Sequence, residues 1–112
     1  MRAPVLNRKL VLESPVSTPD GAGGFAKTWS SVGTIWADVR PGAGKELAGI
    51  EVNVSSVSYL ITVRGAADGS PQRPKAGQRF TEGTRRFEIL AVTEADAEGR
   101  HLKCYAREEV AP

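Results

Sequence analysis

The chain has 112 residues, of which 40% are hydrophobic and 25% charged, a composition that is usual for one globular domain and excludes wholesale disorder. The net charge of +2 is too small to require a nucleic-acid or membrane partner. One cysteine and one histidine exclude an internal disulfide, a cysteine-cluster zinc site and a multi-histidine metal site. No signal-peptide core and no apolar run of about 18 residues occur, so we expect cytoplasmic synthesis and no membrane segment.

The alternation of apolar and polar residues predicts about six short strands and no long helix. In chain order, the segments with this pattern are residues 9–13, 25–30, 35–40, 57–64, 78–81, 86–92 and 101–107. Pro15 is predicted to end the first segment, because proline cannot donate to a sheet ladder, and Gly33 is predicted to separate the second from the third. Residues 1–112 are therefore predicted to form one all-β domain. A small antiparallel β-barrel is favoured over a sandwich because closure removes exposed sheet edges.

Three stretches rich in glycine and proline predict long loops between the strands, at residues 15–24, 41–56 and 65–77. We expect a tight turn at Asp20-Gly21 in the first loop. The second loop is expected to be long and mobile, because its glycines argue against the alternative of two helical turns. The tail, residues 108–112, is expected to fray.

Strand alternation also predicts which side chains face the core. Phe25 and Trp29 share one face of their segment and are predicted to be core residues. Near the C-terminus, the residues predicted to point inward are Leu102, Cys104 and Ala106.

Trp36 lies between the core candidates Ile35 and Ala37, so the same alternation places its ring on the outer face. An exposed tryptophan is costly unless something covers it, which makes Trp36 an interface candidate. Coverage by one of the long loops is the alternative.

No group of residues predicts catalysis, and no catalytic, cofactor-binding or metal-ligating residue is assigned. His101 is interpreted as an exposed strand residue and Cys104 as a small buried one. Glu94, Asp96 and Glu98 lack the flanking pattern of a calcium loop and fit a solvated hairpin tip. We therefore expect a protein that is not an enzyme and needs no cofactor.

A basic cluster precedes an acidic stretch in the second half of the chain. Residues 72–86 contain Arg73, Lys75, Arg79, Arg85 and Arg86 against one acid, whereas residues 88–98 contain only acidic charges. Phe80 and Phe87 interleave with the arginines, so one interpretation is a single-strand nucleic-acid surface with aromatic stacking platforms. In the other, the two patches meet those of neighbouring copies in a ring, which the small net charge favours. A solvated face is the third interpretation.

Four stretches are informative through their order and spacing, although no single one is diagnostic. They are residues 20–29, Trp36-Ala37-Asp38-Val39-Arg40-Pro41, Ile61-Thr62-Val63-Arg64 and Leu102-Lys103-Cys104-Tyr105-Ala106-Arg107-Glu108. From about residue 8 to residue 108, the chain resembles the head-tail joining proteins of tailed phages, prophages and gene transfer agents, also called head-closure or stopper proteins. Two features depart from the resemblance: Gly65 stands where an aromatic residue is expected, and loop 65–77 is longer than expected.

The resemblance implies a structural barrel that assembles into a ring of six or twelve copies at the head-tail junction. Its partners would be a portal or adaptor protein on the head side, a tail protein on the other side, and packaged double-stranded DNA in the channel, with no membrane. The ring would join the DNA-filled head to the tail and help to close the DNA channel. A small β-barrel module that binds single-stranded nucleic acid remains the alternative function.

The resemblance further implies that loop 41–56 projects into the channel. The channel-loop candidates are Gly42, Gly44, Lys45, Glu46, Leu47, Gly49 and Ile50. Because Lys45 is offset by Glu46 and Glu51, blocking by bulk or by loop-to-loop pairing fits better than a charged grip on DNA. The interface candidates elsewhere in the chain are Asp20, Trp36, Arg40, Arg64, Arg73, Arg79, Arg85 and Arg86.

Overall fold

The computed structural model describes residues 3–42 and 56–109, and in this part of the chain all regular structure is β-strand. The strands are β1 (Arg8–Pro19), β2 (Phe25–Pro41), β3 (Ser56–Arg64), β4 (Arg79–Glu82), β5 (Arg85–Glu94) and β6 (His101–Glu109). All their pairings are antiparallel. The prediction of an all-β chain with about six antiparallel strands is thereby confirmed. Among the described residues, no helix is present that could span a membrane.

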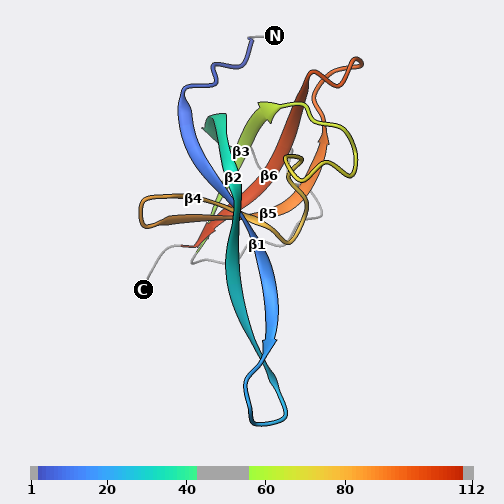
Figure 1. Ribbon diagram of the computed structural model, residues 1–112. Coiled ribbons are helices and arrows are strands. Elements are labelled where there is room, and N and C mark those ends of the chain that lie inside the picture. The colour runs from blue at the N-terminus through green and yellow to red at the C-terminus, as the bar shows by residue number, and fades with distance from the viewer. Residues whose placement is uncertain (1–2, 43–55, 110–112) are drawn as a thin grey trace.

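The strands follow one another around the sheet in the order β1-β2-β3-β6-β5-β4, and β4 pairs back onto β1 to form a closed barrel (Figure 1). The closing strand β4 has four residues and pairs Leu12 of β1 with Phe80. On its other side β4 pairs with β5, which places Phe80 opposite Phe87. A short strand thus joins the two ends of the sheet through large apolar side chains.

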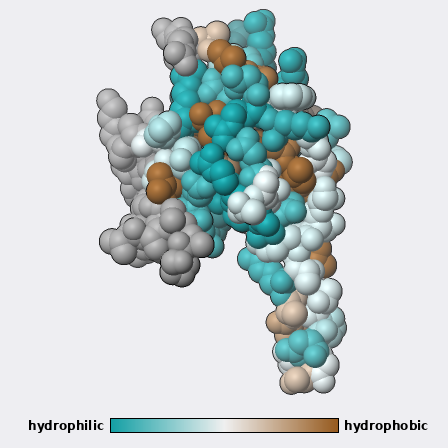
Figure 2. All heavy atoms as spheres, turned by 90° about the vertical axis from the view of Figure 1, so that its left-hand side faces the viewer, coloured by the Kyte–Doolittle hydropathy of each residue, from teal (hydrophilic) through white to brown (hydrophobic). Residues whose placement is uncertain are grey.

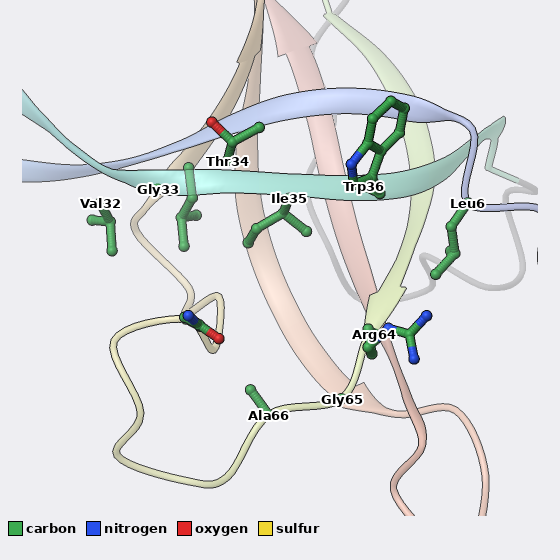
Figure 3. A pocket seen from close by; sticks show the side chains of 11 residues that line it. Leu6, Val32, Gly33, Thr34, Ile35, Trp36, Arg64, Gly65 and Ala66 are labelled. Carbon is green, nitrogen blue, oxygen red and sulfur yellow. The ribbon is translucent and has the colours of Figure 1, made fainter.

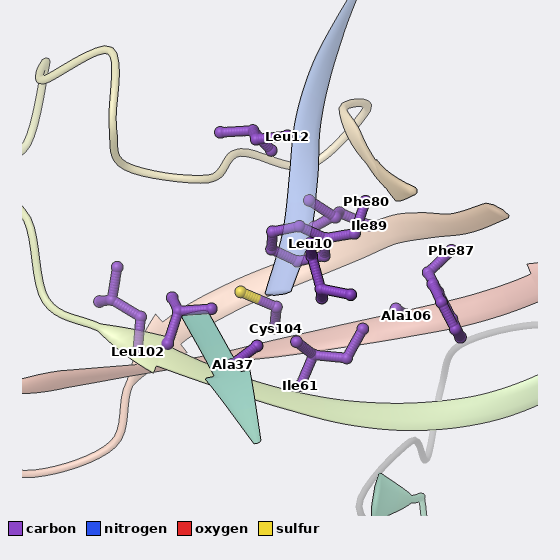
Figure 4. Packing of buried hydrophobic residues seen from close by; sticks show 11 residues of the cluster. Leu10, Leu12, Ala37, Ile61, Phe80, Phe87, Ile89, Leu102, Cys104 and Ala106 are labelled. Atoms are coloured by element: carbon purple, nitrogen blue, oxygen red, sulfur yellow. The ribbon is translucent and has the colours of Figure 1, made fainter. Parts of the chain in front are cut away.

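One cluster of buried hydrophobic residues fills the interior (Figure 4). Its members come from all six strands: Leu10, Leu12, Ala37, Ile61, Val63, Phe80, Phe87, Ile89, Leu102, Cys104 and Ala106. The predicted inward face of β6 is confirmed, since Leu102, Cys104 and Ala106 are fully buried. Burial of this kind contributes roughly 25 cal/mol for each Å² of apolar surface removed from water.

The first two strands are much longer than predicted, and together they form an arm that leaves the barrel (Figure 1). The register shifts between Leu12 and Glu13. From Glu13 to its end, β1 pairs with residues 25–31 of β2. The loop predicted over residues 15–24 is therefore wrong for residues 15–19, which are strand. The break predicted at Gly33 is also wrong, because β2 continues through it.

Both errors follow from the position of these residues at a bulge and in a two-stranded arm. Pro15 pairs with Trp29 and Pro19 with Phe25, in a ribbon where each strand has one open edge. Proline is tolerated at such edges because no inner ladder needs its missing N–H. Gly33 lies beside the register shift, where an extra residue is accommodated by a local bend in the strand.

The aromatic residues of the arm are not core residues, so that prediction is wrong. Phe25 is 73% exposed. Trp29 is half-buried, with the Lys27 ammonium 4.8 Å and the Arg79 guanidinium 4.0 Å from its ring centroid. The arm leaves the barrel before it reaches either aromatic residue, so local alternation alone could not place them. Figure 2 shows the arm standing clear of the body of the molecule.

Two other boundaries differ from the prediction. Strand β6 continues to Glu109, so the first two residues of the expected frayed tail are ordered in the sheet. Pro41 belongs to β2 and Ser56 to β3, and the rest of the predicted loop 41–56 lies outside the described residues except Gly42. The third predicted loop, residues 65–77, contains turns and no strand, as expected.

Candidate assembly surfaces

The arm ends in a turn built around Asp20. Its Oδ1 accepts hydrogen bonds from the amides of Ala22 at 2.8 Å and Gly24 at 3.1 Å. These bonds lower the pKa of the Asp20 carboxyl, so the arm tip carries a negative charge at neutral pH. Gly21 and Gly23 both have φ above +80°, a region that glycine adopts without steric cost. Asp20, predicted to contact a neighbour, thus also shapes the turn that would present it.

At the base of the arm lies an open groove of about 670 Å³ (Figure 3). Its wall on the arm side is β2, where Trp36 is 54% exposed, so the predicted outward orientation of this ring is confirmed. The opposite wall is the segment Arg64 to Ala66, which ends β3 and begins the 65–77 loop. Leu6 and Gln72 also contribute to the lining. The groove is therefore a concave surface of mixed polarity next to a projecting arm.

The surroundings of Gly65 explain why glycine stands where an aromatic residue was expected. Its amide donates to the carbonyl of Arg100 at 2.7 Å, which holds the end of β3 against the turn between β5 and β6. A Cβ built on Gly65 would overlap the carbonyl oxygen of Gly99. No side chain fits at this position, so the close backbone approach requires glycine.

Two of the interface candidates, Arg64 at the end of β3 and Arg40 near the end of β2, have different environments. Arg64 is exposed and makes no ion pair with any described residue. Arg40 instead forms a two-pronged ion pair with the buried carboxylate of Asp38, with distances of 2.8 and 2.7 Å. Asp38 also accepts the amide of Val5 at 2.8 Å, so Arg40 helps to tie the N-terminal segment to the barrel. Of these two arginines, Arg64 is the one whose charge stays available to a partner.

The arginines of the basic cluster form mainly intramolecular ion pairs and hydrogen bonds. Arg79 of β4 contacts Glu13 of β1 at 2.6 Å, and Arg85 of β5 contacts Glu108 of β6 at 2.7 Å. Arg73 donates to a backbone carbonyl at 3.0 Å. Arg86 donates to two carbonyls, those of Gly83 and Arg85. These four interface candidates therefore brace strands and turns, and their contact with neighbouring copies stays a prediction.

The aromatic residues within that cluster cannot act as stacking platforms. Phe80 and Phe87 are completely buried, because alternation turns both rings into the barrel interior. Base stacking needs an exposed aromatic face beside the cations. The prediction that Phe80 lies on a single-strand nucleic-acid surface with Arg73, Arg79, Arg85 and Arg86 is therefore wrong.

Of the three carboxylates at the hairpin tip, Asp96 stabilises the turn between β5 and β6. Asp96 accepts the amide of Arg100 at 2.8 Å, which lowers the pKa of its carboxyl, and it lies 3.6 Å from the His101 imidazole. Among residues 3–42 and 56–109, no group of three or more histidine, cysteine, aspartate or glutamate side chains is placed to hold a metal ion. Cys104 lies in the core, where burial raises the pKa of its thiol to about 12.

The barrel carries two carboxylates whose ionisation is linked to its stability. Hydrogen bonds from Arg85 lower the pKa of Glu108, and hydrogen bonds from Arg8 lower that of Glu82, in each case below a usual value of 4.5. A carboxyl group whose pKa is lower in the folded chain stabilises the fold above the unfolded pKa. That stabilisation is lost as the pH falls through the folded pKa.

We therefore expect the free energy of unfolding to decrease as the pH is lowered from about 5 to about 3. Arg85→Gln should remove the contribution of the Arg85–Glu108 ion pair to this pH dependence. We expect that contribution to be about 1 kcal/mol, because the pair is partly exposed to solvent. Urea unfolding at several pH values measures the effect. The matched control is Arg100→Gln, at an exposed position. Equal slopes for wild type and Arg85→Gln would contradict the assignment.

Of the channel-loop candidates, only Gly42 lies in the described part of the chain, where its amide donates to the carbonyl of Ser58 at 3.0 Å. The others, Gly44, Lys45, Glu46, Leu47, Gly49 and Ile50, lie outside the described residues.

Sequence reasoning missed the arm and its exposed Phe25. A usable signal was present, because residues 14–19 and 25–31 are of similar length and flank a glycine-rich turn that begins with Asp20. Such symmetry about a turn is typical of a β-hairpin.

Comparison with known proteins gives consistent matches over nearly the whole chain. The family model described as phage head completion protein matches residues 1–109. A chain in the virion of a native gene transfer agent particle is 51% identical, with a TM-score of 0.80, and the match covers 98% of this chain and 100% of that one. The solution structure of protein SF1141 from Shigella flexneri 2a has a TM-score of 0.68 at 24% identity, covering 96% of each chain, and supports the fold alone. No curated protein matches the chain.

Proposed function

Because this chain belongs to the phage head completion protein family, we propose that it is a structural, non-catalytic subunit of the connector between the head and the tail of a phage or gene transfer agent particle. The observation that carries the proposal is the 51% identity, over 98% of the chain, to a chain of a native gene transfer agent particle. In this role the protein is made in the host cytoplasm and works at the head-tail junction with head and tail proteins.

We propose further that the subunits form a ring around the DNA channel. A contact between two different patches of the same protein generates a closed ring when its rotation closes. A ring of six or twelve copies then gains stability from many modest interfaces, because each added contact is effectively intramolecular. The molecule suits this use, since its barrel is closed on itself while the arm projects from it.

The prediction that loop 41–56 reaches the channel is retained as part of this proposal. Its support is the sequence, which places Gly42, Gly44 and Gly49 in the segment between β2 and β3. Glycines permit the backbone changes that a segment lining a channel must make.

The test is to follow the protein and its loop variant in purified particles. We expect purified tailed particles to contain the protein. Electron micrographs should show it as a ring between head and tail. Deletion of residues 43–51 should leave a folded barrel but lower the DNA content or the yield of particles. A second variant replaces residues 43–51 by glycine and serine at equal length. It tests whether the length of the segment is sufficient without its native side chains. Normal particles with normal DNA content after the deletion would contradict the role of the loop, and absence of the protein from particles would contradict the proposed function.

A further inference from the structure

The arm presents a large apolar side chain that nothing in the described chain covers. Phe25 is 73% exposed, and Val16 on the other strand of the arm is 39% exposed. A two-stranded hairpin is marginally stable in water without further packing. Since an exposed aromatic ring is also a frequent centre of binding energy at interfaces, the arm has the features of an element that is completed by a partner.

The groove at the base of the arm has the complementary features. Trp36, Ile35 and Leu6 supply apolar surface, and the volume of about 670 Å³ leaves room for an aromatic side chain (Figure 3). Arg64 carries the only charge among the described residues that line this groove. At the arm tip, the carboxylate of Asp20 has the opposite charge and directly follows Pro19, the register partner of Phe25. The other charge near the tip, Lys27, lies against the Trp29 ring. Phe25 therefore matches the apolar part of the groove, and Asp20 matches Arg64 in charge.

The arm cannot reach the groove of its own chain. Phe25 and Gly33 are in the same continuous strand, and Gly33 lines the groove. Eight residues of extended strand separate the two by roughly 26 Å. Only the groove of another molecule is available to Phe25.

We propose that the arm of one copy docks in the groove of the next copy, with Phe25 against Trp36 and Ile35 and with Asp20 beside Arg64. This inference rests on the proposed function, since it names the contact that builds the ring. The two surfaces are different, so each copy offers an arm to one neighbour and a groove to the other. Repetition of such a head-to-tail contact produces a ring when the rotation between copies closes.

Cross-linking between two cysteines tests the contact directly. Ala22→Cys places a thiol at the exposed arm tip, and Gln72→Cys places one at the exposed rim of the groove. The native Cys104 does not interfere, because a buried thiol with a raised pKa reacts poorly with maleimides. A short bis-maleimide is added to purified particles that carry both substitutions. The matched control pairs Ala22→Cys with Thr84→Cys, in the exposed turn between β4 and β5.

We expect a ladder of cross-linked copies for the Ala22 and Gln72 pair, and at least tenfold less product for the control pair. Presence of the protein in particles without this ladder would overturn the docking contact while leaving the proposed function intact. A cross-link from the arm to a different virion protein would overturn it as well, because another partner would then occupy the arm. Absence of the protein from particles would contradict the proposed function itself.

A substitution series gives an independent measurement on the same contact. Adding Phe25→Ala to the cross-linking pair should lower the yield of the ladder about tenfold, whereas Phe25→Leu should retain most of it. Asp20→Asn removes the charge but keeps the Oδ1 acceptor of the turn, and should lower the yield at physiological salt. Val57→Ala, at another exposed apolar position, is the control and should leave the yield unchanged. Equal yields for Phe25→Ala and Val57→Ala would overturn the assignment.

Discussion

Replacing Phe80 with alanine is expected to lower the free energy of unfolding by about 3 to 5 kcal/mol, through lost apolar burial and the cavity left behind. The ring is completely buried between Leu12 of β1 and Phe87 of β5. Strand β4 has only four residues, so this side chain is the main apolar anchor of the strand that joins the sheet ends. A domain of this size is typically stable by roughly 5 to 15 kcal/mol, so the variant should be close to unfolded at moderate temperature.

Urea and thermal unfolding measure this effect, and Phe25→Ala is the matched control because it makes the same substitution at an exposed position. We expect the control to change the free energy of unfolding by less than about 0.5 kcal/mol. Similar stability for the two variants would mean that the ring of Phe80 does not anchor the closing strand. Because the comparison concerns the isolated chain, its outcome does not depend on ring assembly.

Gly65→Ala is expected to lower the free energy of unfolding by about 2 to 3 kcal/mol. The new Cβ would overlap the carbonyl oxygen of Gly99, which is backbone and cannot rotate away as a side chain would. The end of β3 or the turn between β5 and β6 must therefore move. Such a movement weakens the hydrogen bond from the Gly65 amide to Arg100.

The control for Gly65→Ala is Gly33→Ala, where a Cβ has no atom within 4 Å and φ is ordinary for any residue. We expect this control to be neutral or slightly stabilising, because alanine reduces the entropy of the unfolded chain. Urea midpoints measured in the same series compare the two. A Gly65→Ala protein as stable as Gly33→Ala would show that the backbone approach at Gly65 is not required by the fold.

The parts of the fold that sequence could predict are those where one face of a strand is buried along its whole length. Strand β6 is the clearest example, since Leu102, Cys104 and Ala106 alternate without interruption and are all buried. In the arm, the same alternation gave the wrong environment for Phe25 and Trp29. Alternation shows that two faces differ, but it does not show whether a third strand or solvent lies beside them.

The candidate surfaces were less predictable, because the partners of charged side chains come from distant parts of the chain. Arg79 is paired with Glu13, 66 residues away, and Arg8 with Glu82, 74 residues away. Counting charges along the sequence therefore overstated how much of the basic cluster is free for a partner. Trp36 was predicted correctly because its apolar neighbours in the same strand settle which way it points.

The two prolines of the arm have a consequence for solubility. A two-stranded ribbon has open edges, and open edges invite indiscriminate strand addition and fibrous aggregation. Pro15 and Pro19 have no N–H, so the outer edge of β1 cannot supply an unbroken ladder to another polypeptide. The outer edge of β2 in the arm, residues 25–31, has no proline and keeps its backbone N–H groups. The prolines therefore restrict the addition of a further strand to one edge of the exposed hairpin, which lowers its tendency to aggregate.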